Sequence, residues 1–478
     1  MKKMIWLLLF LCGGPLLSQE IANTLPLTLK KNKGVFQVVN NTAKQTSLFF
    51  ADKTDITSVR LDDKMQLIDS ITAKRPEKGY DRMVGSNFDG NSPRLFWTSS
   101  NHEKICLQWF DFDKHAASTQ FYELPYDGER FLETFSSQDH FVILTVLKRS
   151  SSLRLYVFGK DGKMETKTVA LTGKFFDYSY KPTDLYGVLG ENFLPFEAPY
   201  ALQKITNESP VSLTEGAKKR KAYFDGQKLI LTFDNNSKYT HLITIDFADF
   251  SATEEVFQMP YVDGNDFYGV NSNSFLSQDG KLFQMKVSSS KLAVSIKDTQ
   301  NKGAIIKEYT AFDNAPIAFK NSDIIQEKGD YGNTRTLEKT AQFLRKTNNM
   351  NSGVSVCGIG GNYLVTLGSV SEQTDNRMMF GAMFGAAGVL IAAVVWNPTL
   401  DSFNSYQNRK VVTINCLFDT EGNHIPGPVK TLAFDKMRGF LEDRDGISSQ
   451  TIFKLGTFYY LGYYKKDDKK YFIHQFEE

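Results

Sequence analysis

The sequence predicts an all-β fold, a β-propeller with seven four-stranded blades or, as alternatives, six or eight. Two observations indicate it. Short runs of alternating apolar and polar residues follow one another along the chain, separated by Asp-Gly, Asn and Lys turns. A pattern made of a turn and an apolar strand also recurs at intervals typical of propeller blades. Helical periodicity is scarce, and residues 336–347 are the one clear candidate for a helix.

The recurring pattern is a polar turn followed by an apolar strand. Copies lie at residues 88–97, 137–144, 224–231 and 277–283, with a weaker one at 360–365. Two further strands joined by a polar turn come after several copies, at 154–158 with 166–170, 241–245 with 253–257, and 411–417 with 428–432. Four strands in such a meander form one blade.

The spacing of the copies sets the expected number of blades. Second strands begin near residues 46, 94, 141, 228, 281, 362 and 457. Intervals of 47 to 53 residues fit one blade, and intervals of 81 to 95 residues are too long for one. We interpret the long intervals as blades with insertions near 173–216, 312–352 and 371–408, because these segments lack the meander pattern. The alternative is that each long interval contains a second blade whose pattern is not recognisable in the sequence.

The two chain ends are expected to close the ring. Residues 458–460 and 471–474 look like the second and third strands of a last blade. A blade without its outer strand would expose a sheet edge. We therefore expect residues 25–39 to supply an N-terminal strand that completes this blade, so that 19–478 form a single propeller domain.

One copy of the repeat is similar to a known family. Residues 276–282 read Leu-Ser-Gln-Asp-Gly-Lys-Leu, which resembles the turn-and-strand repeat of TolB-like propellers, and the other copies are degenerate. In pattern, most of residues 36–478 resemble secreted bacterial β-propellers. This resemblance implies a ring-shaped binding scaffold and nothing about a substrate, because a fold does not fix a function.

The N-terminus predicts export. Residues 1–18 combine two lysines, an apolar run and a small residue at Ser18, the order of a secretory signal peptide. An uncleaved anchor, or a lipoprotein modified at Cys12, is the alternative. We expect a protein of the periplasm or outer membrane, or an extracellular one. Without Lys2 and Lys3 the chain has 54 basic and 54 acidic residues, so it lacks the positive surplus that nucleic-acid binding requires.

An apolar segment at residues 378–396 predicts contact with a membrane or an envelope protein. Its 19 residues carry no charge, and Gly381 and Gly385 form a GxxxG spacing that allows close helix packing. A single crossing of the membrane would separate two strands that should pair. Three interpretations therefore remain open: a helical hairpin in one leaflet, packing on a second copy or on another membrane protein, and burial on the propeller. The expected contacts are Met378, Met379, Phe380, Gly381, Met383, Phe384, Gly385, Gly388, Val389, Leu390, Ile391 and Trp396.

A second candidate surface is an aromatic, proline-marked segment within 173–216. Loops on a rigid scaffold often carry recognition, and aromatic rings suit contacts with sugars or proteins. The alternative is that these rings only cover a blade face. The candidate recognition residues are Phe175, Phe176, Tyr178, Tyr180, Phe193, Phe196 and Tyr200.

No catalytic, cofactor-binding or metal-binding residue is predicted. The six histidines are dispersed, and the three cysteines after residue 18 are widely spaced, which favours small buried side chains on strands. The acidic turns at 263–266 and 442–446 could supply oxygen ligands to calcium, but neither matches the EF-hand spacing, so we interpret them as solvated turns. We therefore expect a non-enzymatic envelope binding or scaffold propeller. A carbohydrate-active propeller enzyme and a self-assembling envelope protein are the alternatives.

Overall fold

The structure is a computed structural model of the whole chain. It describes residues 20–26, 34–52, 54–192, 197–206, 210–263, 269–328, 332–371, 398–403, 409–442, 444 and 446–477. The predicted signal peptide, the apolar segment 378–396 and the rings of Phe193 and Phe196 lie outside the described residues.

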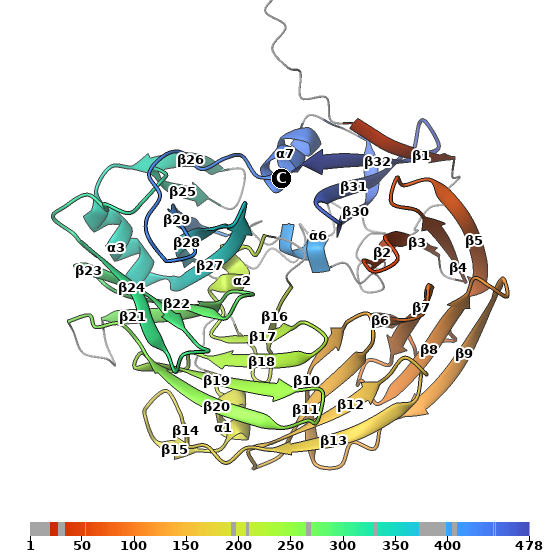
Figure 1. Cartoon of the computed structure of the whole chain (residues 1–478), viewed down its shortest axis with the longest axis horizontal. Coiled ribbons are helices and arrows are strands. Elements are labelled where there is room, and N and C mark those ends of the chain that lie inside the picture. The colour runs from red at the N-terminus through yellow and green to blue at the C-terminus, as the bar shows by residue number, and fades with distance from the viewer. Residues whose placement is uncertain are drawn as a thin grey trace, which may run out of the picture.

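The described strands form seven sheets of four or five strands, arranged as a ring (Figure 1). The first three sheets contain β2 (Gly34–Asn40), β3 (Gln45–Ala51), β4 (Asp55–Leu61) and β5 (Leu67–Lys74); β6 (Arg82–Asp89), β7 (Ser92–Thr98), β8 (Lys104–Asp111) and β9 (Ala116–Glu123); and β10 (Glu129–Ser136), β11 (Phe141–Leu147), β12 (Ser152–Phe158) and β13 (Met164–Ala170). Each is an antiparallel meander, so the fold is a β-propeller.

The other four sheets vary this plan. They contain β16 (Gln203–Ile205), β17 (Arg220–Phe224), β18 (Lys228–Phe233), β19 (Tyr239–Asp246) and β20 (Ala252–Gln258); β21 (Val270–Leu276), β22 (Lys281–Ser288), β23 (Lys291–Asp298) and β24 (Ala304–Phe312); β27 (Asn351–Ile359), β28 (Asn362–Val370), β29 (Val411–Phe418), β25 (Ile324–Lys328) and β26 (Gly332–Leu337); and β30 (Ile447–Leu455), β31 (Phe458–Lys465), β32 (Lys470–Glu477) and β1 (Glu20–Pro26). In the first of these, β16 runs parallel to β17.

The ring has two faces. We call the face that carries the turns between first and second strands, such as 41–44, and between third and fourth strands, such as 62–66, the hairpin face. The opposite face carries the turns between second and third strands, such as 99–103, and the connections between sheets, such as 124–128; we call it the insertion face. Turns of neighbouring sheets meet on the hairpin face, where the carbonyl oxygen of Gln138 accepts a hydrogen bond from the backbone N–H of Phe88.

An N-terminal strand closes the ring, as predicted, but its boundaries differ. Strand β1 pairs antiparallel with β32, with Thr24 opposite Phe472. The closing strand is thus 20–26 and not 25–39, because 34–40 instead form β2, the inner strand of the first sheet. The burial of β2 explains this placement: six of its seven residues are buried, whereas Leu25 is the only buried residue of β1, as an outer strand allows.

The core lies between successive sheets. Inner and second strands are buried, and outer strands such as β9 are largely exposed. The rings of Phe96 and Phe141, from neighbouring sheets, stack with their centroids 4.1 Å apart. Trp97 is fully buried on the other face of the same sheet, against the first sheet of the ring. Large aromatic side chains thus fill the wedge between sheets, where burial of apolar surface stabilises the ring.

Two predicted elements differ in the structure. The helix expected at 336–347 is α3 (Thr340–Asn349), because Thr336 and Leu337 pair with β25 instead. No strand forms at 428–432, where Pro428 lacks the N–H that a ladder needs. Strand β25 takes the position next to β29, with Ile325 opposite Thr413.

Four other helices are described: α1 (Leu185–Gly190), α2 (Leu213–Gly216), α6 (Pro398–Phe403) and α7 (Ala433–Glu442). Among the described residues, no helix is long and apolar enough to span a bilayer. Helix α7 packs on the last sheet through Phe434 and Phe440. Helix α6 lies near the centre of the ring in Figure 1.

Candidate functional site

The candidate site is a small pocket beneath the aromatic segment that follows β13. Phe175–Phe176 (β14) and Pro182–Thr183 (β15) form a short hairpin at the start of this segment. Its turn is held by Asp177, whose Oδ1 accepts hydrogen bonds from the backbone N–H groups of Ser179 at 2.8 Å and Lys181 at 2.9 Å. Helix α1 follows, and Asp184 caps it by accepting a hydrogen bond from the N–H of Gly187 at 2.7 Å.

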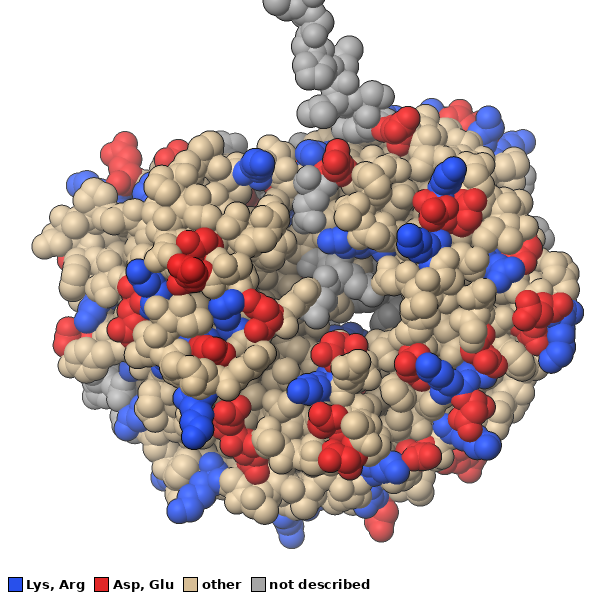
Figure 2. All heavy atoms as spheres, viewed as in Figure 1, with Lys and Arg blue, Asp and Glu red and all other residues tan. Residues whose placement is uncertain are grey.

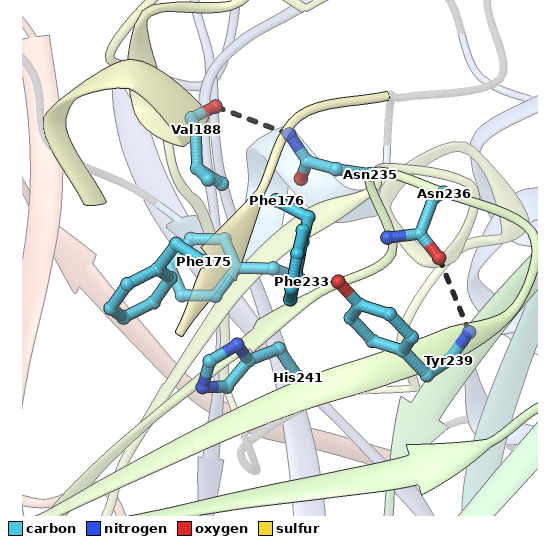
Figure 3. A pocket seen from close by; sticks show the side chains of 8 residues that line it. All are labelled: Phe175, Phe176, Val188, Phe233, Asn235, Asn236, Tyr239 and His241. Atoms are coloured by element: carbon cyan, nitrogen blue, oxygen red, sulfur yellow. Dashed lines mark hydrogen bonds between the residues drawn. The ribbon is translucent and has the colours of Figure 1, made fainter. Parts of the chain in front are cut away.

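Aromatic rings and two asparagines line the pocket (Figure 3). The lining residues are Phe175, Phe176, Val188, Phe233, Asn235, Asn236, Tyr239 and His241. The cavity has a volume of about 10 Å³, close to the space that one water molecule occupies. The buried Oδ1 of Asn235 accepts no hydrogen bond from the described residues, and it is a suitable partner for such a water.

Glu254 on β20 anchors the beginning of the segment. Its Oε1 accepts hydrogen bonds from the N–H groups of Thr172 at 2.8 Å and Gly173 at 2.9 Å. Its Oε2 lies 3.6 Å from Nε2 of His241, whose ring stacks on Phe175 with centroids 4.7 Å apart. Burial lowers the pKa of His241, and Glu254 opposes this change only in part. The neutral imidazole is therefore favoured against the Phe175 ring.

Glu191 holds the other side of the segment. Its Oε1 accepts a hydrogen bond from the N–H of Tyr178 at 2.9 Å, and its Oε2 accepts one from Nδ2 of Asn235. The same Nδ2 donates to the carbonyl oxygen of Val188 at 3.1 Å. Burial raises the pKa of Glu191 to about 7, against the hydrogen bonds that favour its charged form. This carboxyl group titrates near neutral pH.

Arg220 fixes the chain where it leaves α1. Its side chain is fully buried and donates to the carbonyl oxygens of Leu189 and, at 3.0 Å, Ala198. Its Nε lies 3.2 Å from a carboxylate oxygen of Glu197. Because this buried guanidinium has several fixed acceptors, it holds the segment in one position relative to the strand of Arg220. The insertion is therefore attached firmly to the sheet of β16–β20.

The structure brings only part of the predicted recognition set together. Phe175 and Phe176 line the pocket, and the Tyr180 ring lies 4.1 Å below the ammonium of Lys238. Tyr200 instead packs against Tyr186 with centroids 5.0 Å apart.

Exposure then separates these rings. Phe175 is 3% exposed, so it is a core residue and cannot offer its ring to a partner. Tyr178 is 50% exposed, and a recognition role for it stays a prediction.

Sequence reasoning did not identify Glu191, Asn235, His241 and Glu254 as a group. They come from the insertion and from two different strand regions, and no motif links them. Basic residues at 218–221 could have been noticed as an unusual run in a strand, yet their burial depends on Glu197 and Asp234, which are distant in sequence.

The remaining sequence predictions concern metal ligands and the cysteines. Among the described residues, no group of three or more His, Cys, Asp or Glu side chains is placed to hold a metal ion. Cys106 and Cys416 are buried on strands, and Cys357 is half-buried on β27.

A second cavity, of about 40 Å³, lies between the repeat turns at 224–228 and 276–278 on the hairpin face.

The fold and this site define the chain as a β-propeller with a packed aromatic insertion. Neither a family model nor a curated protein matches the sequence. Solved structures similar to it include the β-propeller domain of Nup133 from Vanderwaltozyma polyspora, with 10% identity, 95% of this chain and 97% of that chain covered, and a TM-score of 0.31. The Dos1 propeller has 10% identity, 94% of each chain covered and a TM-score of 0.31. An uncharacterized protein from Listeria monocytogenes EGD-e has 9% identity, 94% and 96% covered, and a TM-score of 0.29.

Proposed function

We propose that the chain is exported and acts as a non-enzymatic binding or scaffold propeller of a cell envelope. In this proposal residues 378–396 hold the ring at a membrane or at a membrane partner. The signal-like residues 1–18 and the uncharged 19-residue run support it. The observation that carries it is the geometry of the described residues on either side of that run.

The stretch of chain that contains the apolar run begins and ends at neighbouring residues of the ring, Ser371 and Lys410. The N–H of Ser371 donates to the carbonyl oxygen of Lys410 at 2.8 Å, and the N–H of Lys410 donates to Oγ of Ser371 at 2.9 Å. Strands β28 and β29 pair directly beside this contact, with Val370 opposite Val411. This pairing follows the sequence prediction.

The C-terminal flank of the run is also attached to the ring. Phe403 of α6 is 7% exposed and packs against Phe434 of α7, with ring centroids 5.4 Å apart. A single crossing would place the two ends of the run about 30 Å apart, on opposite sides of a bilayer. Because both flanks lie on the ring, we favour a segment that enters one leaflet and returns.

The test is to replace residues 378–396 with a Gly-Ser linker of equal length, which keeps Ser371 and α6 in place. The natural and altered chains are expressed with residues 1–18, and the cells are fractionated. We expect the natural chain in the membrane fraction and the linker variant in the soluble envelope fraction, with circular dichroism melting curves that agree.

A matched control removes apolar surface elsewhere. Leu67 and Ile305 are 57% and 58% exposed on outer strands. Leu67→Ser with Ile305→Ser should leave the distribution unchanged. Membrane association that survives the linker replacement would overturn the proposal. A soluble oligomer that dissociates only in the linker variant would instead support the self-assembling alternative.

A further inference from the structure

A cluster of basic side chains lies around Ser371, the last described residue before the apolar run. We call Arg335, Arg345, Lys346, Arg409 and Lys410 the basic patch. They come from β26, from α3 and from the residues just before β29. The patch lies on the insertion face, because β28 ends and β29 begins there.

The backbone register brings these residues together. Arg335 lies opposite Gln326, and Gln326 lies opposite Val412 on β29. Ser369 lies opposite Val412 on the other side, and its hydroxyl donates to the carbonyl oxygen of Lys346 at 3.3 Å. Helix α3 thus places Lys346 next to the row of paired residues that runs across the sheet from Arg335 to Ser369.

Arg409 and Lys410 extend the patch to the exit point. The guanidinium of Arg409 donates to the carbonyl oxygen of Ser371 at 3.2 Å, and the backbone of Lys410 exchanges two hydrogen bonds with the same serine. The basic patch therefore borders the last described residue before the apolar run.

Around the patch, cations outnumber acids in the part of the chain that the structure describes. Among the described side chains of 324–350 and 409–410, six are cationic, and Glu327 and Glu338 are the two acids. Arg345, Lys346 and Lys410 form no ion pair with a described acid. Partial burial and then the neighbouring cations Arg335, Lys410 and Arg345 lower the pKa of Lys346. Like charges held this close are unfavourable without a compensating anion.

We propose that the basic patch binds the anionic headgroups of a phospholipid surface. The inference rests on the proposed membrane role of residues 378–396 and names the lipid class that this role requires. An apolar segment with adjacent Lys and Arg side chains combines the two contributions that give stable membrane attachment. Each cation near an anionic surface strengthens the attachment, and salt weakens it.

The test measures co-sedimentation of the full chain with two kinds of vesicle, phosphatidylcholine alone and phosphatidylcholine with phosphatidylglycerol. The variant Arg345→Gln, Lys346→Gln, Lys410→Gln removes three cations that form no ion pair with a described acid. We expect its partitioning onto the anionic vesicles to fall by about 10- to 100-fold. Partitioning onto neutral vesicles should not change.

A control variant removes the same charge from the hairpin face. Lys44→Gln, Lys64→Gln, Lys302→Gln alters three exposed turn lysines and should bind like the natural chain. Equal binding of the natural chain to both vesicles would overturn the inference and leave the membrane role intact. Fractionation with the membrane but no vesicle binding would also overturn it, and would indicate a protein partner. Loss of association in the fractionation experiment itself would reject the proposed function instead.

Discussion

Lys221 and Asp234 form an ion pair whose two side chains are both fully buried, with 3.5 Å between Nζ and Oδ2. Asp234 also accepts hydrogen bonds from the N–H and hydroxyl of Ser274, at 2.8 and 2.9 Å, and from the hydroxyl of Thr240 at 2.7 Å. Lys221 contacts Asn273 at 3.2 Å. The pair therefore joins the sheet of β17–β20 to the sheet of β21–β24.

Removing one partner of this pair should be costly. Asp234→Ala leaves the Lys221 ammonium buried without its carboxylate, and we expect a loss of about 3–5 kcal/mol in the free energy of unfolding. Urea denaturation measures it. In a Lys221→Met background the same substitution should cost clearly less, because the Lys221 ammonium is no longer there to be left without its carboxylate. Equal costs in both backgrounds would show that the hydrogen bonds of Asp234, and not the ion pair, carry the effect.

Glu191 should make stability fall as the pH rises toward neutrality. Its pKa is about 7 in the folded chain, against an ordinary value of 4.5. Between these values the folded state binds more protons than the unfolded state, so raising the pH destabilises the fold until the pH passes about 7. Glu191→Gln cannot ionise. The variant should gain stability relative to the natural chain over this interval, as thermal melting at a series of pH values would show.

His474 should change the stability of the fold with pH in the direction opposite to Glu191. Its ring is 3% exposed, and its Nε2 lies 3.1 Å from the hydroxyl of Tyr463. Burial, and then Arg444, lowers its pKa from 6.5 to about 4. Between these values the unfolded state binds more protons, so stability is lost as the pH falls.

We expect this loss to be about 1–2 kcal/mol near the lower limit, since partial screening reduces the full effect. The variant His474→Gln should lose less stability than the natural chain as the pH is lowered from 6.5 to about 4. Parallel curves for the two chains would contradict this assignment. Because Glu191 and His474 act in opposite directions where their intervals overlap, the single variants reveal slopes that the natural chain partly hides.

The repeat of turns and alternating strands was enough to predict the propeller, because each meander is encoded locally. The turn at Ser277–Gly280 illustrates this: the hydroxyl of Ser277 accepts a hydrogen bond from the N–H of Lys281 at 3.0 Å, and Gly280 adopts a φ of +82° that favours glycine. Strand β25 was not predictable in the same way. It comes before the inner strand β27 of its sheet in the sequence. It pairs with β29, which lies far later in the chain, so no local sequence pattern predicts this pairing.

The candidate site was predicted only in part, for the same reason. A dense run of aromatic residues marked the segment of Phe175 and Phe176, but the burial of Phe175 depends on stacking with His241 from β19. The partners that hold the segment, Glu254 and Arg220, are tens of residues away in sequence. Only the folded ring places them together.

Strand β1 should contribute to the stability of the ring through its one buried apolar residue, Leu25. This side chain is 6% exposed and belongs to a core cluster with Leu48, Tyr471 and Ile473. Leu25→Ala removes buried apolar surface from the contact between the first and last sheets. We expect a loss of about 2–3 kcal/mol in the free energy of unfolding, measured by urea denaturation. Ile21 on the same strand is 53% exposed, so Ile21→Ala should change stability by about 0.5 kcal/mol or less. If both substitutions proved equally mild, the pairing of β1 with β32 would stabilise the ring through backbone hydrogen bonds alone.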